Sequence, residues 1–235
     1  MNYETIRKDC CQANKALPET GLVDLTFGNV SVFDPSAKVF AIKPSGVPYD
    51  QLTPESMVIL DLEGEIIEGS YRPSSDTPTH RYLFKQWHAG GLTSIVHTHS
   101  RNAVAFAQAA QAIPCLGTTH SDYFHGSIPL TRTMKSGEVE TDYEWNTGKV
   151  IAECFEKNDP LMIPAVLVRN HGPFAWGSSA EKAVETAQAL EIVSEMALKS
   201  LQLRDGAASV PPYLLDKHFY RKHGTTAYYG QPKKP

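Results

Sequence analysis

Histidines are the residues of this chain most able to do chemistry. The chain has 235 residues and nine histidines, and four of these, His97, His99, His120 and His125, lie close together in the sequence. His97 and His99 end a predicted β-strand, where alternate side chains point to the same face, so both imidazoles can converge on one point. Catalytic zinc sites use three protein ligands and leave a fourth position open. The pair therefore predicts two ligands of a metal site.

A third ligand is available beyond another predicted strand. The motif Arg169-Asn170-His171-Gly172-Pro173 follows a buried apolar run and forms a stiff turn. Alone, His171 could equally be a turn histidine that is hydrogen-bonded to the backbone; beside the His97–His99 pair, a metal ligand is favoured. The pairs His120-x4-His125 and His218-x4-His223 match half of a zinc finger, but the cysteine half is absent. Those histidines are expected to be solvated or singly hydrogen-bonded.

Three polar loops could bind an anion. They are Phe27-Gly28-Asn29-Val30-Ser31, Lys43-Pro44-Ser45-Gly46 and the segment 73–80, which includes Ser74, Ser75 and Asp76 and leads into a helix that begins at Thr77-Pro78. A helix N-terminus offers free amide groups and a favourable dipole to negative charge. Each loop alone could be an ordinary turn. Three in one chain predict a small phosphorylated ligand beside the metal.

Composition limits the class of protein. Lys and Arg number 22 against 26 Asp and Glu, a net charge of −4, which disfavours a general binder of nucleic acid or of anionic membranes. The four cysteines, at positions 10, 11, 115 and 154, form no C-x-x-C pair and are expected to be free thiols. The N-terminus lacks the features of a signal peptide, and the longest apolar run, residues 162–168, is too short to span a bilayer. We therefore expect a cytoplasmic protein.

Hydrophobic periodicity and capping signals place the elements that position these residues. Ser178-x-x-Glu181 reads as a capping box that opens a long helix. Further helices are predicted over residues 2–17, 77–87, 100–112, 142–157 and 213–222, and strands over 39–42, 57–62, 66–67, 94–98 and 161–168. No linker divides the chain. The pattern predicts one α/β domain, residues 1–235, with a mixed or mainly antiparallel sheet covered by helices.

Taken together, these motifs resemble the class II aldolase superfamily, and within it the L-ribulose-5-phosphate 4-epimerase family. The resemblance runs from the first predicted helix to Gln231. Its motifs are Gly28-Asn29-Val30-Ser31, Lys43-Pro44-Ser45-Gly46, Pro73-Ser74-Ser75-Asp76-Thr77-Pro78-Thr79-His80, His97-Thr98-His99-Ser100, the segment 117–124, His171-Gly172-Pro173-Phe174-Ala175-Trp176-Gly177, and the tail from Leu215 to Gln231.

The resemblance implies an α/β/α three-layer fold with a central, mainly antiparallel sheet, and one zinc-type divalent metal per subunit. It also implies a homo-oligomer, a cyclic homotetramer, in which the C-terminal segment 213–231 contributes to a neighbouring subunit's active site. The implied site has the following members. Metal ligands are His97, His99 and His171, with Asp76 in or beside the coordination shell; Asp122 and Tyr229 are the acid/base pair; and Gly28, Asn29, Lys43, Ser45, Gly46, Ser74, Ser75, His218 and Arg221 bind the substrate and its phosphate.

The implied activity is the interconversion of L-ribulose 5-phosphate and D-xylulose 5-phosphate through cleavage and re-formation of the C3–C4 bond. The resemblance does not distinguish arabinose catabolism from ascorbate catabolism. One alternative is an aldolase of the fuculose-phosphate type, which releases its fragments and usually has Glu where this chain has Asp76. Another is a non-catalytic adducin-like interaction domain, which predicts lost metal ligands, whereas this sequence keeps them.

Overall fold

A single seven-stranded sheet forms the centre of the protein. The computed structural model describes residues 3–204, 206–225 and 227–231, so the predicted helix start at Asn2 and the ends of the predicted domain lie outside the described residues. The strand order is β4-β3-β2-β1-β5-β7-β6, and every neighbouring pair is antiparallel. The strands are β1 (Asn29–Asp34), β2 (Val39–Ile42), β3 (Val58–Asp61), β4 (Ile66–Glu68), β5 (Ser94–His97), β6 (Ala165–Leu167) and β7 (Pro173–Gly177).

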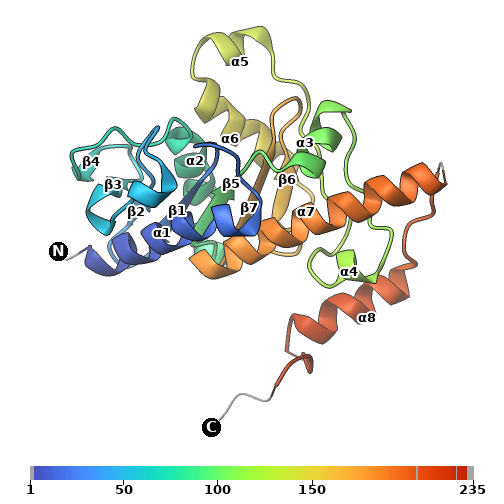
Figure 1. Ribbon diagram of the computed structural model, residues 1–235. Helices are drawn as coiled ribbons and strands as arrows, with labels where there is room; N and C mark the ends of the chain where they lie inside the picture. Colours follow the sequence, from blue (N-terminus) through green and yellow to red (C-terminus); the bar gives the residue numbers. More distant parts are fainter. Residues whose placement is uncertain (1–2, 205, 226, 232–235) are drawn as a thin grey trace.

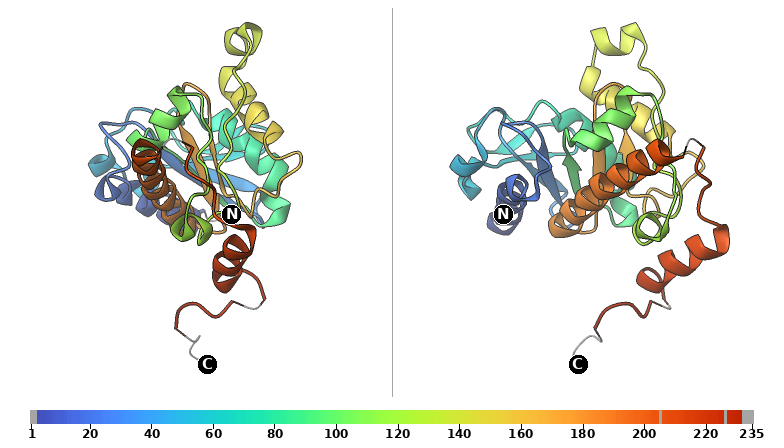
Figure 2. Two further views of the ribbon diagram at one scale, coloured as in Figure 1. Left: turned by 90° about the vertical axis from the view of Figure 1, so that its right-hand side faces the viewer. Right: turned by 45° about the vertical axis from the view of Figure 1, so that its right-hand side comes forward.

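Helices cover both faces of this sheet, which gives the expected three layers (Figure 1). Helices α1 and α7 pack on one face, and α2 with α6 lies on the other, as the view along the strands shows (Figure 2). The helices are α1 (Glu4–Ala16), α2 (Thr77–Trp87), α3 (Arg101–Gln108), α4 (Thr118–Ser121), α5 (Ser136–Glu140), α6 (Tyr143–Glu153), α7 (Ala180–Leu203) and α8 (Pro212–Lys222). No described helix is both long and apolar enough to cross a membrane.

Alternation along the strands explains how the sheet holds α2. Phe33 of β1 lies opposite Phe40 of β2, and both rings contact Phe84 of α2, with centroids 5.2 and 5.5 Å away. Aromatic pairs at such distances add to the stabilisation from burial. In the same register, Asn29 of β1 pairs with His97 of β5, which pairs in turn with Phe174 of β7. The sheet therefore brings residues from three distant parts of the sequence side by side.

Several predicted elements need correction. Residues 27–31 were expected to form a loop, but Asn29 already begins β1, and β7 was not expected at all. The strand predicted over residues 161–168 shortens to β6, because Asp159 ties the preceding chain into a turn through its bond with the Leu161 amide (2.8 Å). The helix cap is Ser179 rather than Ser178, since the Ser179 hydroxyl accepts the Lys182 amide proton at 3.1 Å.

Helix α3 is also shorter than predicted, ending at Gln108 rather than at residue 112. The backbone of Ala110 has a positive φ of 56°, which a continuing α-helix does not allow. The four cysteines carry free thiols, as expected.

Helix α8 projects from the body of the molecule. Both views in Figure 2 show it leaving on the side opposite α5, followed by a tail that extends further. Its contacts with the body run mainly to α4, and its connection to α7 is pinned by the hydrogen bond from the Val210 amide to the Cys115 carbonyl (2.9 Å). The C-terminal segment is thus an arm with a small docking surface.

Candidate active site

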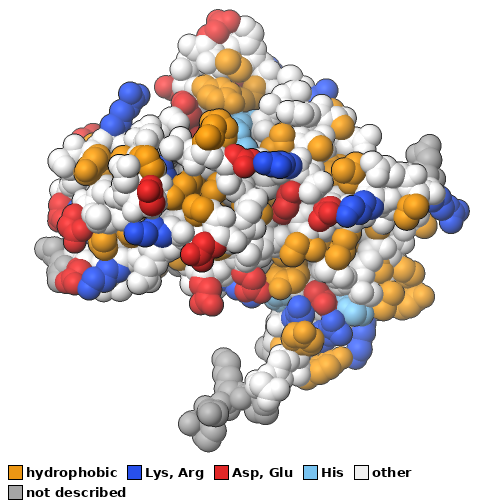
Figure 3. All heavy atoms as spheres, viewed as in Figure 1, with side chains coloured by type: hydrophobic (Ala, Val, Ile, Leu, Met, Phe, Trp, Pro, Cys, Tyr) orange, Lys and Arg blue, Asp and Glu red, His pale blue; other side chains and the backbone are white. Residues whose placement is uncertain are grey.

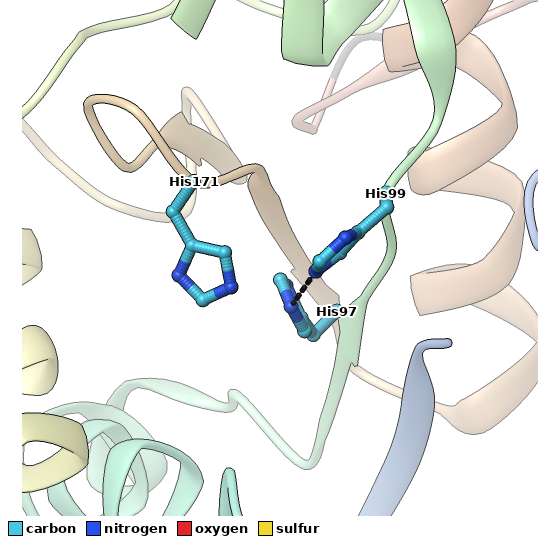
Figure 4. Close-up of side chains that lie close together, drawn as sticks. All are labelled: His97, His99 and His171. Carbon is cyan, nitrogen blue, oxygen red and sulfur yellow. Dashed lines mark hydrogen bonds between the residues drawn. The ribbon is translucent and has the colours of Figure 1, made fainter. Parts of the chain in front are cut away.

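Three histidines converge at one edge of the sheet. His97 is the last residue of β5, His99 lies two residues beyond it, and His171 lies in the turn between β6 and β7 (Figure 4). One nitrogen from each of the three rings lies within 4.8 Å of the others. The Nε2 atoms of His97 and His99 are 3.1 Å apart. The three donor atoms therefore surround a single point, as a metal site requires.

Contacts on the far side of each ring set its orientation. The Nδ1 atom of His97 lies 2.9 Å from the Pro173 carbonyl oxygen, so it carries the proton and leaves the Nε2 lone pair free. The same ring stacks on Phe174 with centroids 4.2 Å apart. His171 places Nδ1 3.3 Å from the Tyr143 hydroxyl, and His99 stacks on Phe27 at 5.4 Å. The rings are thus held in place by the protein alone.

The environment also sets the charge of these histidines. Burial, together with the neighbouring His97 and His99, lowers the pKa of His171 to about 4. Burial likewise lowers the pKa of His99. Neutral imidazole is the form that binds a metal. Three imidazole nitrogens that face one point fit a divalent metal ion.

Asp76 lies beside the three histidines, at the residue that precedes α2. Its Oδ2 accepts a hydrogen bond from the Asn29 amide at 2.6 Å. Burial by itself raises the pKa of the Asp76 carboxyl, but the charges of His97 and His80 and the Asn29 bond outweigh burial and lower it. Asp76 is therefore a carboxylate next to the three nitrogen donors.

The three polar loops meet at the same place. A cleft of about 410 Å³ is lined by all seven loop residues expected to bind phosphate together with the three histidines and Asp76. The Ser45 amide donates to the Arg72 carbonyl at 2.9 Å, and the Ser74 amide donates to the Lys43 carbonyl at 3.0 Å. The Asn29 side chain donates to the Ser74 hydroxyl at 3.2 Å. These bonds join the loops into one wall, in which the side chain of Lys43 is buried.

Gly28 explains why one loop can approach the histidines so closely. Its φ is +87°, and a Cβ at this position would lie 2.8 Å from the His97 carbonyl oxygen. Only glycine combines this backbone conformation with this close approach.

Three cleft residues lie outside the predicted motifs. Tyr143 and Glu144 come from the first turn of α6, and Thr26 precedes the loop 27–31. Tyr143 contacts His171, and its pKa is raised by burial and by the Asp76 carboxylate. No spacing or turn signal marks residues in the first turn of a helix as cleft residues, so sequence reasoning had nothing to find them by.

The other predicted site residues form a second cluster, outside this cleft. Asp122, just beyond α4, accepts two bonds from Arg221 at 2.8 and 3.1 Å, and one from His218 Nδ1 at 3.0 Å. The Arg221 guanidinium also lies over the Tyr229 ring, 5.1 Å from its centroid. In Figure 3, basic and histidine side chains surround an acidic one where α8 meets the body. The structure therefore divides the predicted site into two groups: the cleft and the Asp122 cluster.

Comparison with known proteins accounts for the fold. Residues 8–198 match the family described as Class II Aldolase and Adducin N-terminal domain. The chain belongs to this family. Over 228 residues, 97% of this chain and 99% of the relative, it is 47% identical to the L-ribulose-5-phosphate 4-epimerase UlaF of Salmonella paratyphi A. The same values hold for the protein of that name from Salmonella typhi.

Solved structures share the class II aldolase fold. An L-fuculose 1-phosphate aldolase superposes with a TM-score of 0.79 at 21% identity, covering 94% of this chain and 97% of the other. YgbL from Klebsiella pneumoniae, described as a putative aldolase/epimerase/decarboxylase, gives 0.70 at 20% identity, covering 92% and 99%. At these identities the likeness shows that this chain has the class II aldolase fold. The reaction has to be inferred from the residues of the site.

Proposed function

We propose that this class II aldolase family member is an L-ribulose-5-phosphate 4-epimerase, which interconverts L-ribulose 5-phosphate and D-xylulose 5-phosphate. The observation that carries the proposal is the cleft, where three histidines and Asp76 face polar loops suited to phosphate. It occurs in a chain that is 47% identical, over nearly its whole length, to a relative of that name. The enzyme thus acts on a sugar phosphate.

Inversion at C4 could proceed by direct deprotonation or by cleavage of the C3–C4 bond. The groups adjacent to C4 do not acidify it, so cleavage is the route that we propose. Breaking the C3–C4 bond yields a three-carbon fragment and glycolaldehyde phosphate, which rotates before the bond re-forms on its other face. His97, His99 and His171, with Asp76 beside them, would hold a divalent metal, and we propose zinc. When bound, the metal supplies a Lewis acid for the negative charge that develops on the ketone oxygen.

Retention of the aldehyde fragment is the task of the phosphate loops. Ser74 and Ser75 lie just before α2, where free amide groups and the helix dipole favour an anion. Ser45 and Gly46 approach from the opposite loop, and the Lys43 ammonium adds positive charge to the same wall. A phosphate held from two sides stays bound while the aldehyde end turns.

Proton transfer at the C4 oxygen needs one group on each face, and we assign Asp122 and Tyr229 to it. These residues lie outside the cleft of their own chain, with His218 and Arg221 around Asp122. The proposal therefore places the Asp122 cluster of one subunit against the cleft of the next, in a homotetramer. The projecting α8 arm, docked mainly on α4, supports this placement.

The test is an assay of the metal-free and the zinc-restored protein. Incubation with L-ribulose 5-phosphate should yield D-xylulose 5-phosphate only after zinc is restored. Absence of any metal-dependent interconversion would refute the epimerase proposal.

A fuculose-phosphate type aldolase is the second candidate, because a solved aldolase of that kind shares the fold with a TM-score of 0.79. The same assay distinguishes the two reactions. An aldolase releases glycolaldehyde phosphate, which an added aldehyde reductase would trap in stoichiometric amounts. The epimerase should release none while D-xylulose 5-phosphate accumulates.

A further inference from the structure

Lys222, the last residue of α8, occupies the centre of the Asp122 cluster. Its ammonium nitrogen lies 3.7 Å from Asp122 Oδ2. It also lies 4.6 Å from the centroid of the Tyr229 ring and 4.7 Å from the centroid of the Tyr123 ring. A lysine at such distances from two aromatic faces forms two cation–π interactions. The Lys222 ammonium therefore contacts Asp122 and Tyr123 of the body and Tyr229 of the tail.

Tyr229 has few other contacts that would fix its position. The residue is 62% exposed, and its backbone amide donates to the Arg221 carbonyl at 2.9 Å. Its ring lies over the Arg221 guanidinium and the Lys222 ammonium, and no hydrogen bond of its hydroxyl joins it to another described residue. The location of the ring thus depends on the two cations, while its hydroxyl stays available to a substrate.

The two cations are held differently. Arg221 is fixed by two bonds to Asp122 and adds no contact to the body beyond it. Lys222 reaches the Tyr123 ring, and the Tyr123 hydroxyl donates to Glu185 of α7 at 3.0 Å. Glu185 also pairs with Lys182 at 2.8 Å. Lys222 is therefore the link that ties the tail to α7 through Tyr123.

We propose that Lys222 is a positioning residue that holds the Tyr229 ring beside Asp122 by a cation–π sandwich with Tyr123. This inference rests on the proposed function for the proton-transfer role of Tyr229. The charged and titratable groups around Tyr229 are Arg221 and Lys222 of α8, Asp122 and Tyr123 beyond α4, and, behind Tyr123, Glu185 of α7.

The first test replaces Lys222 in the full-length zinc enzyme. Lys222→Met keeps the aliphatic stem and removes the charge, so kcat should fall about tenfold with little change in KM. Lys222→Arg, which keeps the positive charge, should restore kcat. Lys217→Met is the matched control, since Lys217 makes the same kind of contact with Tyr228 (5.0 Å) away from Asp122, and its kcat should equal that of the wild type.

The second test asks whether the Tyr123 ring carries the contact. Tyr123→Phe keeps the aromatic face and loses only the bond to Glu185, whereas Tyr123→Leu loses the face. The leucine variant should lower kcat as Lys222→Met does, and the phenylalanine variant should retain most of it. Equal losses in the two variants would overturn the sandwich.

Hydrogen exchange gives a readout that does not depend on activity. The amides of Tyr228 and Tyr229 both donate to the Arg221 carbonyl at 2.9 Å, and their protection reports the position of the tail. Lys222→Met should speed their exchange severalfold, and unchanged exchange together with unchanged kcat would overturn the proposal. If the wild type lacks epimerase activity, the proposed function fails, while the exchange rates still decide whether Lys222 positions the tail.

Discussion

His97 shows how a single side chain prepares a site before any ligand binds. One ring nitrogen donates to the Pro173 carbonyl at 2.9 Å, and the ring stacks on Phe174 at 4.2 Å. The other nitrogen faces those of His99 and His171. A backbone bond of this kind selects the tautomer and the direction of the free lone pair. The register between β5 and β7 therefore determines where the free nitrogen of His97 points.

Replacement of His97 tests the assignment of the metal. His97→Asn removes the central nitrogen donor but keeps an amide that can bond to the Pro173 carbonyl. Bound zinc, measured by elemental analysis after dialysis, should fall well below one ion per subunit, and epimerase activity should fall with it. His125→Asn is the control, because His125 pairs with Asp216 on the arm (2.7 Å) and lies outside the cleft. Full zinc content in the His97 variant would show that the site is elsewhere.

Elements that are marked by local sequence signals were predictable, and elements that depend on contacts with other helices and strands were not. Helix α2 begins at Thr77-Pro78 as predicted, because proline in the first turn of a helix is a local signal. The start of strand β1 was missed because Asn29 and Ser31 are polar and follow a glycine, which is typical of a loop. Both side chains are buried in the structure, and Ser31 bonds to the buried His80 ring at 2.6 Å. A buried polar side chain of this kind can be recognised only when its hydrogen-bond partner on a neighbouring element is known.

The candidate site shows the same division. Its histidines and polar loops could be found in the sequence, because the His-x-His spacing and the polar turn residues are local signals. Tyr143 and Glu144 could not, because only the packing of α6 against α2 brings them to the cleft. The position of α6 is thus a structural requirement of the site.

Gly148 is the contact through which α6 lies close to α2. A Cβ at this position would lie 2.6 Å from Tyr82 Cβ, an atom attached directly to the α2 backbone. Gly148→Ala should therefore lower the free energy of unfolding by about 1–3 kcal/mol, measured by urea denaturation. It should also raise KM, because α6 carries Tyr143 and Glu144 into the cleft.

A second glycine serves as the control for that change. Gly137 lies in α5, where an added Cβ would meet nothing within 4 Å and the φ is not positive. Gly137→Ala should leave stability and KM unchanged or raise stability slightly, because alanine favours a helix. Equal stability of the two variants would contradict the close packing of α6 on α2.

The docking of α8 on α4 should depend on pH in a defined direction. Burial raises the pKa of the Asp122 carboxyl, but bonds from Arg221 and His218 and the charge of Lys222 outweigh burial and lower it below 3.8. A lowered pKa stabilises the docked arm above the ordinary value, and this contribution is lost as pH falls through the lowered one. Protection of the amides in residues 213–222, corrected for the intrinsic exchange rate, should stay high at pH 5 and fall only when the pH drops below 3.8.

A variant isolates the cause of that dependence. Asp122→Asn removes the titrating carboxylate and should give rapid exchange in α8 already at pH 5 to 7, with little further pH dependence. An arm that loosens at the same pH in both proteins would show that Asp122 does not control the docking.

At the scale of the whole molecule, the proposed reaction needs two surfaces that one chain keeps apart. The cleft lies where β1, β5 and β7 meet the start of α6, and the Asp122 cluster lies between α4 and the α8 arm, on the side opposite α5. We propose that the cleft of one subunit and the Asp122 cluster of its neighbour together form one active site.

Complementation between two inactive variants tests this arrangement directly. His97→Asn disables the cleft and leaves the Asp122 cluster intact, whereas Tyr229→Phe removes the hydroxyl and leaves the cleft intact. In a cyclic tetramer of mixed subunits, a working site forms wherever the cleft of a Tyr229→Phe subunit meets the arm of a His97→Asn subunit. Random mixing makes this about one contact in four, so co-expressed variants with different tags should recover about a quarter of the wild-type activity. Co-expressed protein no more active than the average of the two separate variants would place both halves of the site within one chain.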